Sequence, residues 1–219
     1  MTMNPERGRV PNPLIDQLTQ ELEPVRAIRL RDGLALVALA MVGTVLAVEF
    51  IDGLWRGAFA GEASAFFVIG NGLLLVLGLA AATSAVGMAS PRVGNRHEGP
   101  KWAMAMAAVL PAGALLSLLG HDHPASGFDD PYGLECMTKG LIASLLVTGS
   151  LVVWLRRGAP VSASAAGLLV GTAAASLGSV AYGLACPIDT VAHIGIWHFA
   201  PVPIGALIGR LALPPLLRW

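Results

Sequence analysis

Residues 65–88 read AFFVIGNGLLLVLGLAAATSAVGM, and this stretch contains no charged side chain. About 20 consecutive apolar residues are enough for a helix to cross the hydrocarbon core of a bilayer. Five further apolar runs of similar length lie at Leu34–Phe50, Trp102–Leu119, Met137–Leu155, Ala159–Ala185 and His193–Leu213. The sequence therefore predicts six membrane-spanning helices.

The composition also indicates a chain that spans a membrane. The chain is 55% hydrophobic and 13% charged, whereas soluble domains carry roughly 25% charged residues. A transmembrane barrel needs alternating polar positions along its strands, and these runs show none. We therefore expect an all-α fold, with a six-helix transmembrane bundle at residues 34–219 and a short cytoplasmic N-terminal segment at residues 1–33. This excludes a soluble enzyme.

The basic residues indicate which ends of the spans face the cytoplasm. Of the 14 lysines and arginines, all but Arg56 and Lys139 lie before span 1, after spans 2 and 4, or at the end of span 6. Loops rich in lysine and arginine remain on the cytoplasmic side of a membrane. Both termini are therefore expected in the cytoplasm, with the lipid bilayer as one partner of the chain.

A short amphipathic helix is predicted at residues 12–23 of the N-terminal segment. Asn12-Pro13 is a typical helix start, and Pro24 disfavours helix at the residue before it. The expected binding face and its acidic neighbours are Leu14, Ile15, Asp16, Leu18, Glu21, Leu22 and Val25. Helices that lie on anionic lipid usually present basic residues, so the acidic residues here favour a basic protein surface. Two alternatives stay open: the helix docks on lipid or on the bundle itself, or the segment is disordered.

The two cysteines are predicted to meet on the extracytoplasmic side. Cys136 opens span 4 and Cys186 closes span 5, and adjacent antiparallel helices bring such ends together. A permanent disulfide, a reversible dithiol switch and two unrelated residues are the three alternatives. The helix N-terminus and Lys139 favour the thiolate at Cys136, whereas Glu135 opposes it. If the two cysteines act as a redox pair, Cys136 is the better attacking sulfur.

Four histidines share this compartment: His121, His123, His193 and His198. Cysteine and histidine together suit zinc, copper or cadmium, so these side chains and the two cysteines are candidate metal ligands. Their spacing matches no zinc motif, and histidines that bind no metal are the alternative. Small residues recur at every fourth position of span 5, which favours close helix packing inside the chain or, as the lesser alternative, in a dimer. The oligomeric state stays open, and no nucleic-acid patch is present.

Several short motifs resemble those of the NrsF-type family and cover nearly the whole chain. They are Leu14-Ile15-Asp16-Gln17-Leu18 with Leu22, Pro24-Val25-Arg26 and Arg29, then Cys136, Cys186-Pro187, Trp197 and the terminal Leu217-Arg218-Trp219. The chain departs from the family in its histidine-rich segment between spans 5 and 6 and in its long acidic loop at His121–Glu135.

Members of this family are six-span anti-sigma factors of the bacterial inner membrane. The resemblance implies that the chain holds an extracytoplasmic-function sigma factor away from RNA polymerase, with the N-terminal helix as the docking element. It also implies that oxidants or heavy metals acting at Cys136 and Cys186 release the sigma factor. No catalysis and no resident cofactor are expected, only a transient heavy-metal ion at the cysteines. A membrane thiol oxidoreductase and a small permease are the alternatives, although only one cysteine pair exists and few charges lie inside the spans.

Overall fold

The computed structural model of the chain describes residues 13–20, 28–90, 98–119 and 130–217. Within these ranges the regular structure is entirely helical, which confirms the predicted all-α fold. The helices are α1 (Pro13–Gln20), α2 (Leu30–Ile51), α3 (Arg56–Ala60), α4 (Ala65–Gly87), α5 (Glu98–Ala107), α6 (Val109–Leu119), α7 (Gly133–Ala143), α8 (Leu145–Leu155), α9 (Ala163–Gly183), α10 (Val191–His193), the π-helix η2 (Ile194–His198), α11 (Pro201–Ala212) and α12 (Pro214–Leu217).

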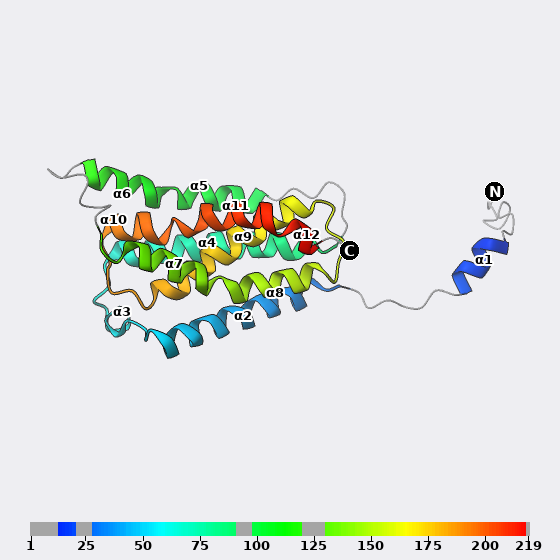
Figure 1. The fold of residues 1–219 in the computed structure, drawn as a ribbon, viewed down its shortest axis with the longest axis horizontal. Helices are drawn as coiled ribbons and strands as arrows, with labels where there is room; N and C mark the ends of the chain where they lie inside the picture. Colours follow the sequence, from blue (N-terminus) through cyan, green and yellow to red (C-terminus); the bar gives the residue numbers. More distant parts are fainter. Residues whose placement is uncertain (1–12, 21–27, 91–97, 120–129, 218–219) are drawn as a thin grey trace, which may run out of the picture.

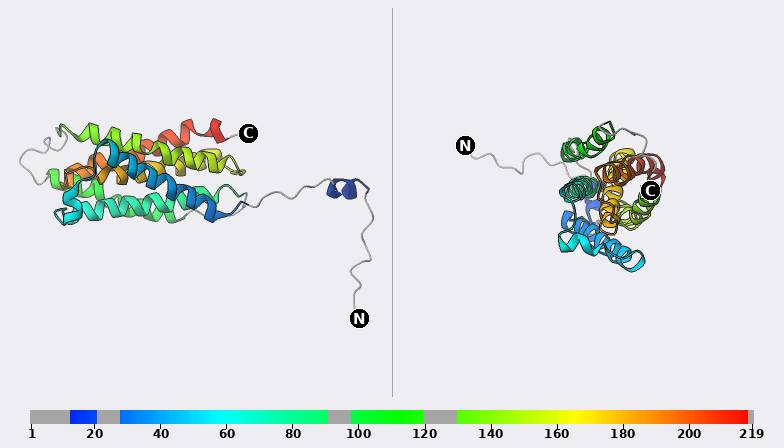
Figure 2. Two further views of the ribbon diagram at one scale, coloured as in Figure 1. Left: turned by 90° about the horizontal axis from the view of Figure 1, so that it is seen from below. Right: turned by 90° about the vertical axis from the view of Figure 1, so that its left-hand side faces the viewer.

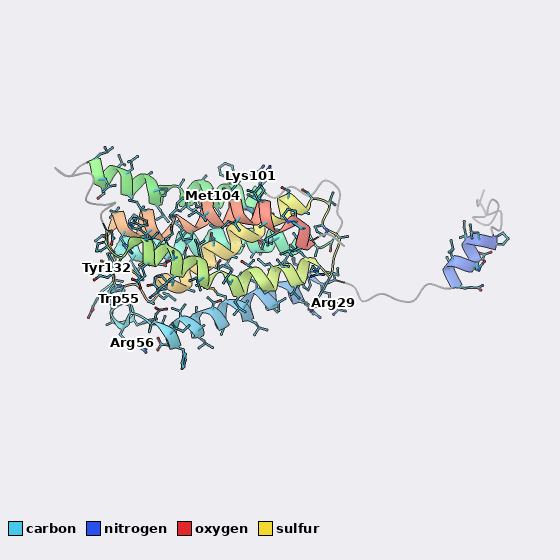
Figure 3. The ribbon with its side chains drawn as sticks, in the orientation of Figure 1. Arg29, Trp55, Arg56, Lys101, Met104 and Tyr132 are labelled. Atoms are coloured by element: carbon cyan, nitrogen blue, oxygen red, sulfur yellow. The ribbon has the colours of Figure 1, made fainter. Side chains whose placement is uncertain are left out.

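Among the described residues, six helical stretches are long and apolar enough to cross a membrane, as predicted. They are Leu30–Ile51, Ala65–Gly87, Glu98–Leu119, Gly133–Leu155, Ala163–Gly183 and Val191–Ala212. Each boundary lies within about one helical turn of its predicted position. Successive spans run antiparallel, so the bundle has two ends (Figure 1). Figure 3 shows Arg29 at one end, called here the basic end, and Trp55, Arg56 and Tyr132 at the other, called the cysteine end.

Helix α9 is the centre of the bundle. Its most apolar window is 72% buried inside the protein, whereas the other spans reach 22–39%. Several glycines on α9 have no room for a side chain, and two of them face α11. A Cβ on Gly167 would collide with the carbonyl oxygen of Gly209, and a Cβ on Gly171 would collide with that of Gly205. The small residues of span 5 therefore let α9 and α11 pack backbone to backbone within one chain, which was the first of the two predicted explanations.

Side-chain and backbone contacts lock three spans together at the basic end. The indole Nε1 of Trp154 donates to the carbonyl oxygen of Val86 at 3.1 Å. The same indole lies against Gly33, where a Cβ would not fit. The amide of Ala159 donates to the carbonyl oxygen of Ala89 at 3.0 Å. Spans 1, 2 and 4 are therefore fixed to one another where the basic residues gather.

The N-terminal helix α1 does not pack into the bundle core. It contains no buried residue, and Figures 1 and 2 show it apart from the spans. Its apolar side chains stay largely exposed: Leu14 is 61%, Ile15 57% and Leu18 54% exposed. The structure describes the predicted helix over Pro13–Gln20. Three predicted binding residues lie outside the described residues, namely Glu21, Leu22 and Val25.

Candidate functional site

The two cysteines lie beside each other at the cysteine end of the bundle. Cys136 is in the first turn of α7, and Cys186 follows the C-terminus of α9. Their Sγ atoms are 3.7 Å apart, both side chains are buried, and both are free thiols. The antiparallel packing of α7 and α9 thus brings these two residues together as the sequence predicted.

Two of the four candidate histidines join the thiols. The Nε2 atom of His193 lies 3.4 Å from the Sγ atom of Cys186. The rings of His193 and His198 have centroids 5.2 Å apart. One ligand atom from each of these four residues lies within 4.8 Å of every other. The other two predicted ligands, His121 and His123, lie outside the described residues.

The π-helix η2 explains why His193 and His198 share one face. They are five residues apart, and at ~100° per residue an α-helix would separate them by roughly 140°. The repeat of a π-helix places residues five apart close to one above the other, and such turns recur at functional sites. The π-turn at Ile194–His198 therefore points both imidazoles toward the cysteines. Periodicity alone does not reveal this turn.

Asp130 is a site residue that the sequence analysis missed. Its Oδ2 atom lies 2.5 Å from Nδ1 of His193, and its Oδ1 atom accepts the amide of Tyr132 at 2.9 Å. Burial by itself would raise the pKa of Asp130, but the hydrogen bonds from His193 and Tyr132 outweigh it, and the pKa is lowered. The carboxylate is therefore ionised and can only accept. Nδ1 of His193 therefore donates to it, and Nε2 is the ring nitrogen that faces Cys186.

The loop that carries Cys186 is tied to neighbouring elements. Asp189 accepts the amide of Ser64 at 2.8 Å, and the hydroxyl of Ser64 donates to the Asp189 carbonyl at 3.1 Å. The amide of Trp55 donates to the carbonyl oxygen of Leu184 at 2.8 Å. Thr190 caps α10 by accepting the amide of His193. Both ends of the loop are thereby held, so its cysteine and histidine keep a fixed relation.

His198 is buried with one nitrogen unsatisfied. Its side chain is 4% exposed, and Nε2 has no hydrogen-bond partner among the described residues. The ring stacks on Tyr182 with centroids 6.4 Å apart. Gly183 leaves room for it, since a Cβ there would lie 3.3 Å from Nδ1 of His198. A buried polar group without a partner typically costs about 1–3 kcal/mol.

The expectation that Lys139 activates Cys136 is not met. The Nζ atom of Lys139 lies 2.6 Å from Asp52 and 2.9 Å from Glu135, so its charge is directed to these carboxylates. The hydrogen bond from Cys136 lowers the pKa of the Cys186 thiol, although burial opposes the shift. This shift is opposite to the one that a helix C-terminus alone predicts for the thiol of Cys186.

This arrangement supports two kinds of thiol chemistry. Two sulfurs and two imidazole nitrogens are ligands that soft and borderline metal ions prefer. The same two sulfurs can form a disulfide when they approach to the bond length of about 2.05 Å. A disulfide would shorten the distance between α7 and the end of α9, whereas a metal ion would tie the two at close to their present spacing.

Comparison with known proteins adds one match. A family model described as NrsF, negative regulator of sigma F, matches residues 18–219. The matched range includes the six spans, both cysteines, Asp130 and both site histidines, and it begins inside α1. No curated protein and no solved structure matches the chain.

Proposed function

Because the chain belongs to the family of negative regulators of sigma F, we propose that its partner is a sigma factor of the extracytoplasmic-function class. The chain holds this factor at the cytoplasmic face of a bacterial inner membrane, where it cannot bind RNA polymerase. The described basic residues support this orientation, because Arg29, Arg156 and Arg210 lie at or near one end of the bundle. The two bases near the other end, Arg56 and Lys139, both pair with carboxylates.

The docking element of this proposal is α1. Ile15 and Leu18 are more than half exposed on one side of the helix, and Asp16 supplies a negative charge beside them. Full burial of a leucine or isoleucine side chain contributes roughly 1.5–3 kcal/mol. An apolar stripe with an acidic neighbour fits a sigma factor surface that has an apolar groove and a basic rim.

The trigger is the pair Cys136 and Cys186, and the observation that carries it is the 3.7 Å approach of two buried free thiols. With a peroxide, each thiol loses a proton and an electron, one S–S bond forms, and the O–O bond breaks to give two molecules of water. With a heavy-metal ion, the thiols lose their protons to solvent and the thiolates bind the ion. A disulfide draws α7 and the end of α9 together, and a bound metal ion links the two.

The signal travels through α9. Cys186 is bonded to the last turn of this helix, since its amide donates to the carbonyl oxygen of Gly183. Helix α9 then runs without a break to Ala163 at the basic end. Span 4 is less suited to transmit a movement along its length, because it is divided at Ser144 into α7 and α8. We therefore place the coupling in α9 and in the helix α11 that packs on it.

The energetics predict a graded response. A shift between two bundle arrangements from 1:99 to 99:1 needs about 5.5 kcal/mol. One disulfide typically supplies about 2–4 kcal/mol. A single bridge therefore releases only part of the bound sigma factor.

Co-purification tests the proposal. The tagged full chain is isolated from membranes together with its sigma factor partner, and hydrogen peroxide or Cd²⁺ is then added. Release from the wild type but not from Cys136→Ser or Cys186→Ser supports the proposal. Retention of the sigma factor by the oxidised wild type, with the disulfide shown by loss of thiol alkylation, contradicts it.

A further inference from the structure

We propose that His193 and His198 complete a four-coordinate site with Cys136 and Cys186 for a divalent cation of the Zn²⁺ or Cd²⁺ kind. The inference deepens the proposed function and rests on it. It states that metal sensing needs two imidazoles that oxidant sensing does not need. The four residues come from α7, from the loop after α9, and from the consecutive helices α10 and η2 of span 6. An ion bound among them therefore joins three parts of the bundle.

The distances fit tetrahedral coordination. With zinc–sulfur bonds of about 2.3 Å, two sulfurs on one tetrahedral ion are about 3.8 Å apart. With a zinc–nitrogen bond of about 2.05 Å, sulfur and nitrogen are about 3.6 Å apart. The protein holds Cys136 Sγ and Cys186 Sγ at 3.7 Å and Cys186 Sγ and His193 Nε2 at 3.4 Å. The donors are therefore already spaced for an ion between them.

Asp130 prepares His193 for this role. Imidazoles that bind metal ions usually donate their other N–H to a carboxylate, which fixes the tautomer and the ring orientation. Asp130 accepts from Nδ1 of His193 at 2.5 Å, so Nε2 is the nitrogen offered toward Cys186. A histidine with only a structural role would not need its other ring nitrogen, Nε2, to face the thiol of Cys186. Asp130 is here a positioning residue and not a ligand.

The unsatisfied nitrogen of His198 is the second, independent observation. Nε2 of His198 is buried in the cluster and has no partner among the residues that the structure describes. A bound cation would accept this lone pair and remove the deficit. Two thiols alone would serve a disulfide switch and would leave this nitrogen unexplained.

Charge balance favours a divalent ion. Binding of M²⁺ releases one proton from each thiol to solvent, and the two thiolates then neutralise the two positive charges. The imidazoles bind as neutral ligands, so the ion and its four ligands together carry no net charge. A neutral complex avoids the cost of burying an unpaired charge. Hard cations that require oxygen ligands are excluded as occupants, because the nearby carboxylate of Asp130 is engaged by His193.

X-ray absorption on the full chain loaded with Cd²⁺ alone tests the inference. The reduced protein is placed in lipid nanodiscs, and the sulfur and imidazole neighbours of cadmium are counted. The wild type should show two sulfurs and two imidazoles. His198→Gln should lose one imidazole and bind Cd²⁺ at least 10-fold more weakly, since even outer partners of a metal site contribute 10–100-fold. A wild type with two sulfurs and no imidazole overturns the inference.

Two further variants distinguish the loss of a metal ligand from misfolding of the site. His198→Cys should restore tight binding with three sulfurs and one imidazole, which a merely misfolded site would not do. Ser176→Ala is the matched control, because Ser176 is fully buried and bonded within α9 to the carbonyl oxygen of Thr172. It should retain two sulfurs and two imidazoles. A sulfur count that stays at two in His198→Cys contradicts the placement of residue 198 at the ion.

An oxidant arm separates this inference from the proposed function. Hydrogen peroxide should still form the Cys136–Cys186 disulfide in His198→Gln, because that bond needs only the sulfurs. If Cd²⁺ binds to two sulfurs and two imidazoles but no sigma factor leaves, the proposed function fails and the site stands. If the sigma factor leaves on Cd²⁺ addition equally well from the wild type and from His198→Gln, the inference fails and the function stands.

Discussion

Replacing Leu18 by aspartate should weaken sigma factor binding without harming the membrane domain. Leu18 is 54% exposed, and the helix α1 that carries it contains no buried residue. About half of its surface therefore remains to be buried on a partner. Half of the usual 1.5–3 kcal/mol is about 0.8–1.5 kcal/mol, which corresponds to roughly a 4- to 13-fold loss of affinity. Placing a carboxylate in an apolar contact adds to this loss.

The assay is a titration of the purified sigma factor against the full chain in nanodiscs. Gln20→Asp is the matched control: it adds the same charge two residues away, ~200° around the helix from Leu18. The thermal unfolding temperatures of both variants should equal that of the wild type. Equal affinity of Leu18→Asp and Gln20→Asp for the sigma factor would refute α1 as the docking element.

Three further predictions concern packing, the metal site and topology. Gly171→Leu should lower the thermal unfolding temperature in detergent, because any Cβ at this position meets the Gly205 carbonyl and overpacking typically costs 1–3 kcal/mol. Gly149→Ala, on α8 with open space around it, should not lower that temperature, and equal destabilisation of both variants would contradict the packing of α9 on α11. Asp130→Asn should weaken Cd²⁺ binding about 10- to 100-fold while two sulfurs and two imidazoles remain on the ion; an unchanged affinity would remove Asp130 from the site. Reporter fusions at Gly61 and after Leu217 should report opposite compartments, and a shared compartment would contradict the six-span topology.

The spans were predictable because their signal is local. An uncharged stretch such as 65–88 specifies a crossing helix by length and hydrophobicity alone, and the structure places α4 at Ala65–Gly87. The meeting of Cys136 and Cys186 also followed, since antiparallel neighbours bring such ends together. The small residues of span 5 predicted close packing, and α11 packs against two of them, Gly167 and Gly171.

The finer features of the site depend on contacts that no local pattern encodes. The turn that aligns His193 with His198 is a π-helix, whereas ordinary helical spacing would have pointed them apart. Asp130 precedes span 4 by a few residues and gave no signal beyond its charge, yet it fixes the tautomer of His193. Lys139 was predicted to favour the thiolate at Cys136 because it lies one turn away on the same helix. Its partner Asp52 comes from span 1, and only the folded bundle brings the two together.

The central claim is that the state of the two thiols controls the sigma factor. Its most direct test follows thiol alkylation and the output of the sigma factor's target promoter in the same cells, before and after exposure to hydrogen peroxide or Cd²⁺. We predict that promoter output rises as the alkylation of Cys136 and Cys186 falls. We also predict that Cys136→Ser/Cys186→Ser keeps output at its unstressed level. Full induction in the double variant would contradict the account.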